Sequence, residues 1–159
     1  MTDPQCSLEA ISRERLQKLL SAGMRLAAER NLDGLLSLIV QEATEAMAAE
    51  RCTLYLLDAE KQEMCARITE GKDAVQIRVP LGSGIAGIAG KTGEIINIPD
   101  AYQDSRFDPA FDRRTGYRTR SMLCVPMQNA RGTTIGAIEA LNKQSGRFLA
   151  EDENMLMAL

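Results

Sequence analysis

The 159-residue sequence contains no histidine. Imidazole is a very common metal ligand and the usual proton carrier near neutral pH. Its absence therefore excludes histidine-ligated haem, histidine-containing zinc sites and catalytic triads that use histidine. An enzyme of such a class would need its catalytic part outside these residues. We expect a non-catalytic chain with no metal site and no required cofactor.

Paired cysteines, long apolar runs and an excess of one charge are also lacking. The four cysteines form no Cys-x-x-Cys pair, and Cys52, Cys65 and Cys124 lie in apolar segments where a free thiol packs as a small hydrophobe. No run approaches the ~18 apolar residues of a membrane span, and residues 1–10 are too polar for a signal peptide. The formal net charge of −3 attracts neither nucleic acid nor an anionic membrane. We expect a cytoplasmic protein that binds neither.

Two helices are predicted at the start of the chain, over residues 7–30 and 35–49, because apolar residues recur there at helical spacing. Residues 31–34 break the pattern and offer a cap. The first helix either packs on its own domain or forms a dimer. A loose a/d stripe fits the dimer but is too short to decide, and it consists of Leu16, Leu19, Gly23 and Leu26.

Six strands follow, over residues 52–57, 64–69, 75–79, 95–98, 121–128 and 135–141. A short helix follows the Gly-rich residues 81–90, residues 100–117 form a long connection, and a last helix opens near Asp152. The pattern predicts one α+β domain with a central antiparallel sheet. Three helices cover one face, and the short helix and long connection cover the other. The sequence stops inside an apolar helical pattern, so we expect the last helix to be truncated.

The predicted strand 135–141 contains one carboxylate, Glu139. A buried carboxylate is costly without a partner, so Glu139 either faces a cavity or pairs with an arginine such as Arg118 or Arg120. After the strand, Lys143 and Asp152 are placed to form an ion pair between strand and helix.

The Gly-rich segment offers either an anion site at a helix start or a tight turn capped by Ser83. It lacks the Gly-Lys-Ser/Thr of a Walker loop, so nucleoside triphosphate hydrolysis is not expected. The connection 100–117 holds four of the six aromatic residues, so we expect it to pack down onto the sheet. The alternating arginines and aspartates within and just after it are typical of a solvated, self-paired surface.

Residues 142–153 carry the pattern Asn142-Lys143, then Phe148, then Asp152-Glu153. This pattern resembles the signature of cyclic-nucleotide-binding GAF domains. Three further segments resemble regulatory GAF domains of phosphodiesterases and of some bacterial adenylyl cyclases: 84–87, 97–102 and 115–120. The resemblance implies a PAS-related GAF domain over residues 31–159, preceded by a linker or signalling helix over residues 1–30.

The resemblance also implies which residues bind a ligand. Ile85 and Ala86 would offer backbone amides to a phosphate, with Tyr102 nearby. Thr115 and Glu139 match positions that reach the sugar or phosphate. The base would lie near Thr53, Thr69 and Glu70. Relatives often carry an aromatic residue where this chain has Thr69, so the choice of purine is not predicted.

The resemblance implies a regulatory sensor that binds a cyclic nucleotide, cAMP or cGMP, and signals through flanking helices, as a homodimer joined by its terminal helices. The alternative is a dimerisation module that binds another small molecule or none. Free methionine sulfoxide reductases use this fold, but they need clustered reactive cysteines that this chain lacks. Bilin binding has no support, because the usual pocket histidine has no counterpart.

Overall fold

The computed structural model describes residues 13–69 and 77–159, with the side chains of residues 67–69 left outside the description. Six antiparallel strands form one sheet in the order β3-β2-β1-β6-β5-β4. Their bounds are Ala49–Asp58 (β1), Glu63–Thr69 (β2), Arg78–Pro80 (β3), Ile96–Ile98 (β4), Met122–Gln128 (β5) and Thr134–Lys143 (β6). The predicted fold class is confirmed, with β6 beside β1 and β5.

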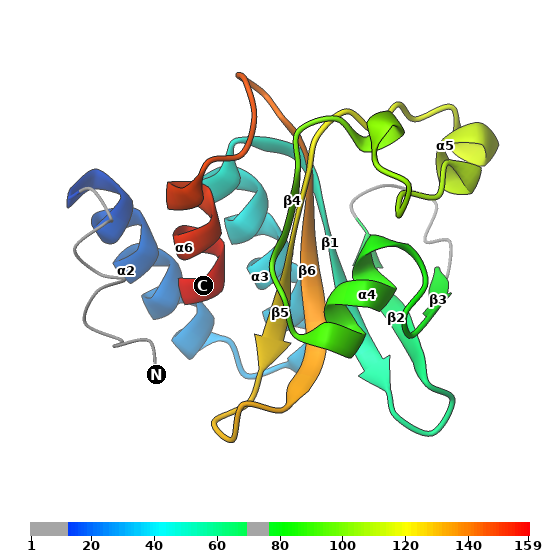
Figure 1. Cartoon of the computed structure of the whole chain (residues 1–159). Helices are drawn as coiled ribbons and strands as arrows, with labels where there is room; N and C mark the ends of the chain where they lie inside the picture. Colours follow the sequence, from blue (N-terminus) through cyan, green and yellow to red (C-terminus); the bar gives the residue numbers. More distant parts are fainter. Residues whose placement is uncertain (1–12, 70–76) are drawn as a thin grey trace.

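Helices cover both faces of the sheet, as predicted (Figure 1). One face carries three helices, α2 (Arg13–Ala28), α3 (Leu32–Met47) and α6 (Ala150–Ala158). The other face carries α4 (Gly84–Thr92) and, beyond it, the connection that holds η1 (Ala101–Gln103) and α5 (Ala110–Thr115). Asn31 caps α3 by accepting from the Asp33 N–H at 3.0 Å. The break predicted at residues 31–34 is therefore a helix start.

The connection between β4 and β5 differs from the prediction, which placed no regular structure in it. A short 3₁₀ turn and the six-residue helix α5 interrupt it. Asp100 begins the 3₁₀ turn by accepting from the Tyr102 N–H at 3.2 Å, and Gly116 ends α5 with φ 75°. Phe107 and Tyr117 pack against the buried core, which confirms that the connection packs down.

Side chains of β6 alternate between two buried layers, because successive residues of a strand point to opposite faces. Ile138 and Ala140 join the core under α3 and α6. Ala137 and Leu141 join the core on the α4 side. Glu139 lies between these two in the alternation, so the carboxylate points into the α4 side of the molecule.

The end of β6 is fixed by Asn142, which is fully buried and has φ 58°, a left-handed conformation that asparagine tolerates better than most residues. Its side-chain amide donates to Glu50, to the Tyr117 hydroxyl and to the Arg118 carbonyl at 2.9–3.0 Å. Its side-chain oxygen accepts from the Arg120 N–H at 2.5 Å. One buried residue therefore ties β6 to the segment that follows α5.

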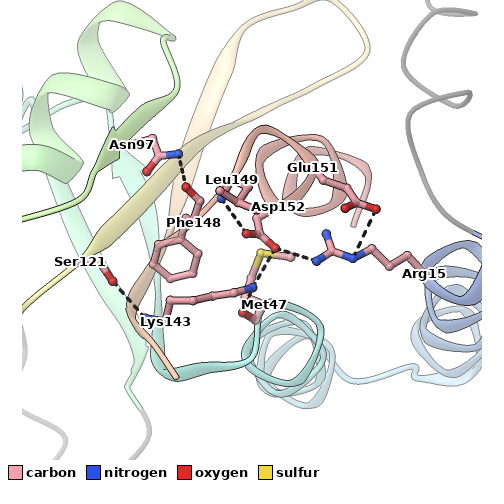
Figure 2. A network of polar contacts seen from close by, with 9 residues as sticks. All are labelled: Arg15, Met47, Asn97, Ser121, Lys143, Phe148, Leu149, Glu151 and Asp152. Carbon is pink, nitrogen blue, oxygen red and sulfur yellow. Dashed lines mark hydrogen bonds and ion pairs between the residues drawn. The ribbon is translucent and has the colours of Figure 1, made fainter. Parts of the chain in front are cut away.

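The next residue, Lys143, ties the sheet to the helices (Figure 2). Its Nζ donates to Asp152 at 2.9 Å and to the Met47 carbonyl at 2.8 Å. The predicted Lys143–Asp152 pair is thus confirmed. Asp152 also accepts from the Leu149 N–H at 2.8 Å, so the third residue of α6 reaches back to the N-cap residue, whose own side chain makes no capping hydrogen bond. Burial opposes ionisation of Asp152, but these two donors outweigh it, so the pKa of Asp152 is lowered.

Phe148 and Glu153, the other two members of the motif, hold α6 on the sheet. The Phe148 ring is buried in the core under α6. Asn97 of β4 donates to the Phe148 carbonyl at 3.1 Å and to the Glu153 carboxylate at 2.8 Å. All five motif residues are therefore structural contacts at the junction of sheet and helices.

Helix α2 is held mainly by two arginines that reach buried carboxylates. Arg15 donates to Asp152 at 3.1 Å, and Arg25 pairs with Glu42 of α3. Among its own residues only Ala22 is buried. Leu19 of the predicted stripe packs against the core of its own domain. The most exposed apolar line on α2 consists of Leu16, Leu20 and Met24, and it shares only Leu16 with the predicted stripe.

Candidate functional site

A cavity of about 290 Å³ lies between the sheet and the elements that cover its α4 side. Small-molecule sites in proteins begin at about this size. Strands β1 and β6 form its floor with Arg51, Thr53, Tyr55, Glu139 and Leu141. Strand β3 forms a further part of the walls, and the start of α4 and the connection around α5 supply Ser83, Gly84, Ile85, Ala86, Phe107, Asp108, Phe111, Asp112 and Arg114.

The distinctive polar group of this cavity is the carboxylate of Glu139. The residue is only 7% exposed, and it lines the cavity. Within residues 13–69 and 77–159, no hydrogen bond or ion pair reaches its carboxylate. Burial raises the pKa of Glu139 to about 7, because the charged form loses hydration without gaining a partner. A buried carboxyl group without a partner is a functional-site candidate on physical grounds.

Of the two alternatives predicted for Glu139, the structure agrees with the one that faces a cavity, and the pairing with Arg118 or Arg120 is wrong. The Arg118 guanidinium lies over the Tyr102 ring, 3.7 Å from its centroid. Arg120 pairs with Glu50 near the start of β1, and the hydrogen bond from Arg120 lowers the pKa of Glu50. Both arginines follow α5 in the chain, and the turn held by Asn142 directs them away from the cavity floor.

The start of α4 faces the cavity, which agrees with the predicted place of Ile85 and Ala86. Ser83 is the N-cap residue, but its side chain makes no capping hydrogen bond. The first amides of a helix carry partial positive charge and suit an anion when a side chain does not cap them. Gly87 allows this helix to lie close, since a Cβ atom there would collide with the Pro80 carbonyl oxygen.

The segment around α5 forms a cover that is pinned by the buried carboxylate of Asp112. The Asp112 carboxylate accepts from the Thr119 N–H at 2.7 Å, from the Thr119 hydroxyl at 2.8 Å and from the Tyr102 hydroxyl at 2.9 Å. Asp112 was missed because its neighbours alternate in charge, which is typical of a solvated surface. That interpretation is correct for the exposed Asp104–Arg106 pair and wrong for Asp112, which is 5% exposed.

The other predicted ligand residues fall into three groups. Thr53 is buried on β1 and lines the cavity beside Glu139, its partner in the β1–β6 register. Neither Tyr102 nor Thr115 lines the cavity that the described residues form. Tyr102 acts through Asp112, and the Thr115 hydroxyl donates to the Phe111 carbonyl at 2.8 Å. The Thr69 side chain and Glu70 lie outside the described part, so their roles stay predictions.

Three arginines along the cavity were also missed by sequence reasoning. Arg51 lies 4.7 Å from the centroid of the Tyr117 ring, and Arg114 lies 5.9 Å from that of Phe111. Arg78 of β3 pairs with Glu63 at 3.2 Å. Strand alternation could have predicted the position of Arg51, because residues 51, 53 and 55 share one face of β1. All three bring positive charge to a cavity that also holds Glu139.

Comparison with known proteins identifies this architecture. The family model described as "GAF domain" matches residues 31–159, which is most of the chain. The chain belongs to the GAF domain family. This family consists of regulatory modules, and the match covers both the cavity and the Asn142–Glu153 motif.

Among its relatives, the GAF domain is 37% identical over 123 residues to dual 3′,5′-cyclic-AMP and -GMP phosphodiesterase 11A of Takifugu rubripes. It is 36% identical over 129 residues to dual 3′,5′-cyclic-AMP and -GMP phosphodiesterase 11 of Drosophila melanogaster. The matches cover 70% and 71% of this chain but only 14% and 9% of those proteins. The chain thus corresponds to a small part of each phosphodiesterase.

Solved structures agree on the fold. The GAF domain of an Acinetobacter phosphoenolpyruvate-protein phosphotransferase is 26% identical and superposes with a TM-score of 0.78, covering 92% of this chain and 87% of that one. The free methionine-R-sulfoxide reductase of Neisseria meningitidis has a TM-score of 0.73 at 20% identity, covering 92% and 85%. The fold therefore occurs in an enzyme as well as in regulatory modules. Within the described helices of this chain, none has the length and apolarity needed to cross a membrane.

The pKa of Glu139 predicts how stability changes with pH. Its folded value of about 7 lies above the ordinary value of 4.5, so the folded state binds the proton more tightly. The stability that this provides is complete below pH 4.5 and is lost as pH rises through 7. Glu139→Gln mimics the protonated form. We expect the free energy of unfolding of this variant, relative to that of the parent, to be about 2–3 kcal/mol higher at pH 8 than at pH 5.

Urea unfolding at both pH values measures this difference, and exposed Glu60 provides the control. Glu60→Gln should leave the pH dependence of the parent unchanged. A Glu139→Gln protein that gains no stability at pH 8 relative to pH 5 would mean that the carboxylate has a partner in solution.

Proposed function

We propose that this GAF domain is a regulatory sensor that binds a cyclic nucleotide, cAMP or cGMP, in the cavity beside Glu139. The observation that carries the proposal is that one cavity joins an uncapped helix start to a carboxyl group that has no partner among the described residues. A cyclic nucleotide needs an anion site, polar partners for sugar and base, and a cover that excludes water. Ile85 and Ala86 would serve the phosphate, while Glu139 and Thr53 would serve the sugar and base.

The relatives support the same ligand class, because both phosphodiesterases named above act on cAMP and cGMP by name. The aromatic rings of Phe107 and Phe111 line the cavity and would supply the apolar contact that the missing aromatic at Thr69 does not.

Transmission to the flanking helices would run along β6. Glu139 lies four residues before Lys143 on the same strand, and Lys143 shares the Asp152 carboxylate with Arg15 of α2 (Figure 2). A ligand that moves β6 or the Asn142 turn would change this shared contact. In this proposal α2 is the output element, and its docking reports whether the cavity is occupied.

The chain is proposed to act without catalysis of its own. Cys52 of β1 and Cys124 of β5 are buried in strand interiors. The Cys65 thiol lies on β2, where it accepts from Arg78 of the neighbouring strand β3. Burial raises the pKa of the Cys124 thiol, which opposes its use as a nucleophile. The sulfoxide reductase fold is therefore shared without support here for its chemistry.

Thermal unfolding with and without ligand tests the binding proposal. A ligand at 100 times its dissociation constant stabilises the folded state by about 2.7 kcal/mol, which raises Tm by about 5–10 °C for a domain of this size. We expect such a rise with millimolar cAMP or cGMP and none with 5′-AMP. A protein free of bound nucleotide by mass spectrometry that shifts with neither would contradict the proposal.

Hydrogen exchange of α2 tests transmission. Arg15→Gln removes a charge-assisted contact to Asp152, so the α2 amides should exchange about tenfold faster. We also expect cyclic nucleotide to change α2 exchange in the parent and not in this variant. Lys18→Gln removes only an exposed pair with Glu14 on the same helix and should behave like the parent. Equal ligand effects in the parent and Arg15→Gln would rule out this route.

The exposed line on α2 favours a homodimer through the terminal helices, which we propose as part of the sensor and as the core of the alternative function, a dimerisation module. Leu20 and Met24 are 63% and 76% exposed, one helical turn apart. Apolar side chains in such a line commonly mark an interface.

Sedimentation equilibrium tests this dimer. Leu20→Glu with Met24→Glu should weaken association at least about tenfold, because two carboxylates would be buried at the interface. Leu32 is similarly exposed but lies outside this line, at the start of α3, so Leu32→Glu should leave association unchanged. A parent protein that stays monomeric at millimolar concentration would contradict the dimer.

A further inference from the structure

The charged groups around the cavity are nearly balanced. Among the described residues that line it, three are guanidinium groups and three are carboxyl groups, namely Arg51, Arg78, Arg114, Asp108, Asp112 and Glu139. Arginine and aspartate side chains are ordinarily charged near neutral pH. The proton on Glu139 therefore decides whether the described walls carry no net charge or one positive charge.

Although the walls hold three guanidinium groups, none of the described side chains forms an ion pair with Glu139. Thr53 faces it from β1 and Cys124 from β5 in the strand registers. Burial and the nearby Glu139 raise the pKa values of both Tyr55 and Cys124, so these two stay neutral near pH 7. Arg78 is already paired with Glu63, and Asp112 is pinned by Thr119 and Tyr102. Among the three carboxyl groups that line the cavity, Glu139 can therefore change its charge without the loss of a hydrogen bond to the described residues.

An anionic ligand meets Glu139 inside one small cavity. The start of α4, where an anion is favoured, and the Glu139 carboxyl group line the same 290 Å³ space. Two negative charges that share a poorly hydrated cavity repel each other far more strongly than in water. A protonated carboxyl group removes this repulsion, and its O–H can also donate to an acceptor on the ligand.

We propose that Glu139 selects the ligand by charge, and that an anionic nucleotide binds this cavity only with Glu139 protonated, so that each binding event takes up a proton from the buffer. The inference rests on the proposed function, since it concerns the same cavity. It adds that cyclic-nucleotide affinity depends on pH across the neutral range. The pKa of about 7 places the free carboxyl group where small pH changes alter its charge.

Titration calorimetry of the chain with cAMP and with cGMP tests this inference. Measurement at pH 7.5 in PIPES and in Tris, which differ in ionisation enthalpy, gives the number of protons exchanged. With a free pKa of about 7, we expect uptake of about three-quarters of a proton per ligand and a Kd that rises about tenfold between pH 6 and pH 8. Glu139→Gln should bind with no proton exchange and a flat pH profile, while Glu60→Gln should match the parent.

Each outcome is decisive. Binding to the parent without proton uptake, or with proton release, would overturn this inference and leave the proposed function intact. The pH profile of the parent alone carries the test if Glu139→Gln does not fold. Uptake that persists in a folded Glu139→Gln protein would place the proton elsewhere and also overturn it. No binding of either nucleotide at any pH would overturn both the proposed function and this inference.

Discussion

The end of β6 is the constraint on which the rest of this structure depends. Two consecutive residues there have buried polar contacts in opposite directions. Asn142 holds the segment after α5 with three hydrogen bonds and Glu50 of β1 with a fourth, and Lys143 holds the helical layer through Asp152. In both cases hydrogen bonds within the protein replace those that the side chain would make with water, and burial without them would cost free energy. The cover of the cavity and the docking of α6 and α2 are therefore fixed from one point on the central strand.

This constraint explains how the same strand can leave Glu139 without a partner. The two arginines that Asn142 contacts through their backbone have their side chains elsewhere, Arg118 against Tyr102 and Arg120 against Glu50. The structure thus tolerates an unfavourable buried carboxyl group in one cavity while neighbouring polar groups are satisfied. Such a buried group, in a chain whose packing and hydrogen bonding are otherwise consistent with the fold, is typical of a functional site.

Much of the fold could be predicted from periodicity, because strands and amphipathic helices bury alternating or helically spaced residues. The Lys143–Asp152 pair could be predicted because a short link joins strand to helix. The role of Asp112 could not be predicted from the sequence. Its helix is only six residues long, and its partners Tyr102 and Thr119 come together through the packing of the connection, which sequence spacing does not define. The choice between the two alternatives for Glu139 could not be made for the same reason, because the sequence does not define the direction of the Arg118 side chain, which lies over Tyr102.

The central claim is that the cavity beside Glu139 is the ligand site and that β6 joins it to the helices. A crystal structure of the chain grown with saturating cyclic nucleotide tests it most directly. We expect density for the nucleotide between the start of α4 and β6, with the phosphate near the amides of Ile85 and Ala86 and a polar ligand atom within hydrogen-bond distance of Glu139. An empty cavity with nucleotide bound elsewhere on the domain would contradict the claim.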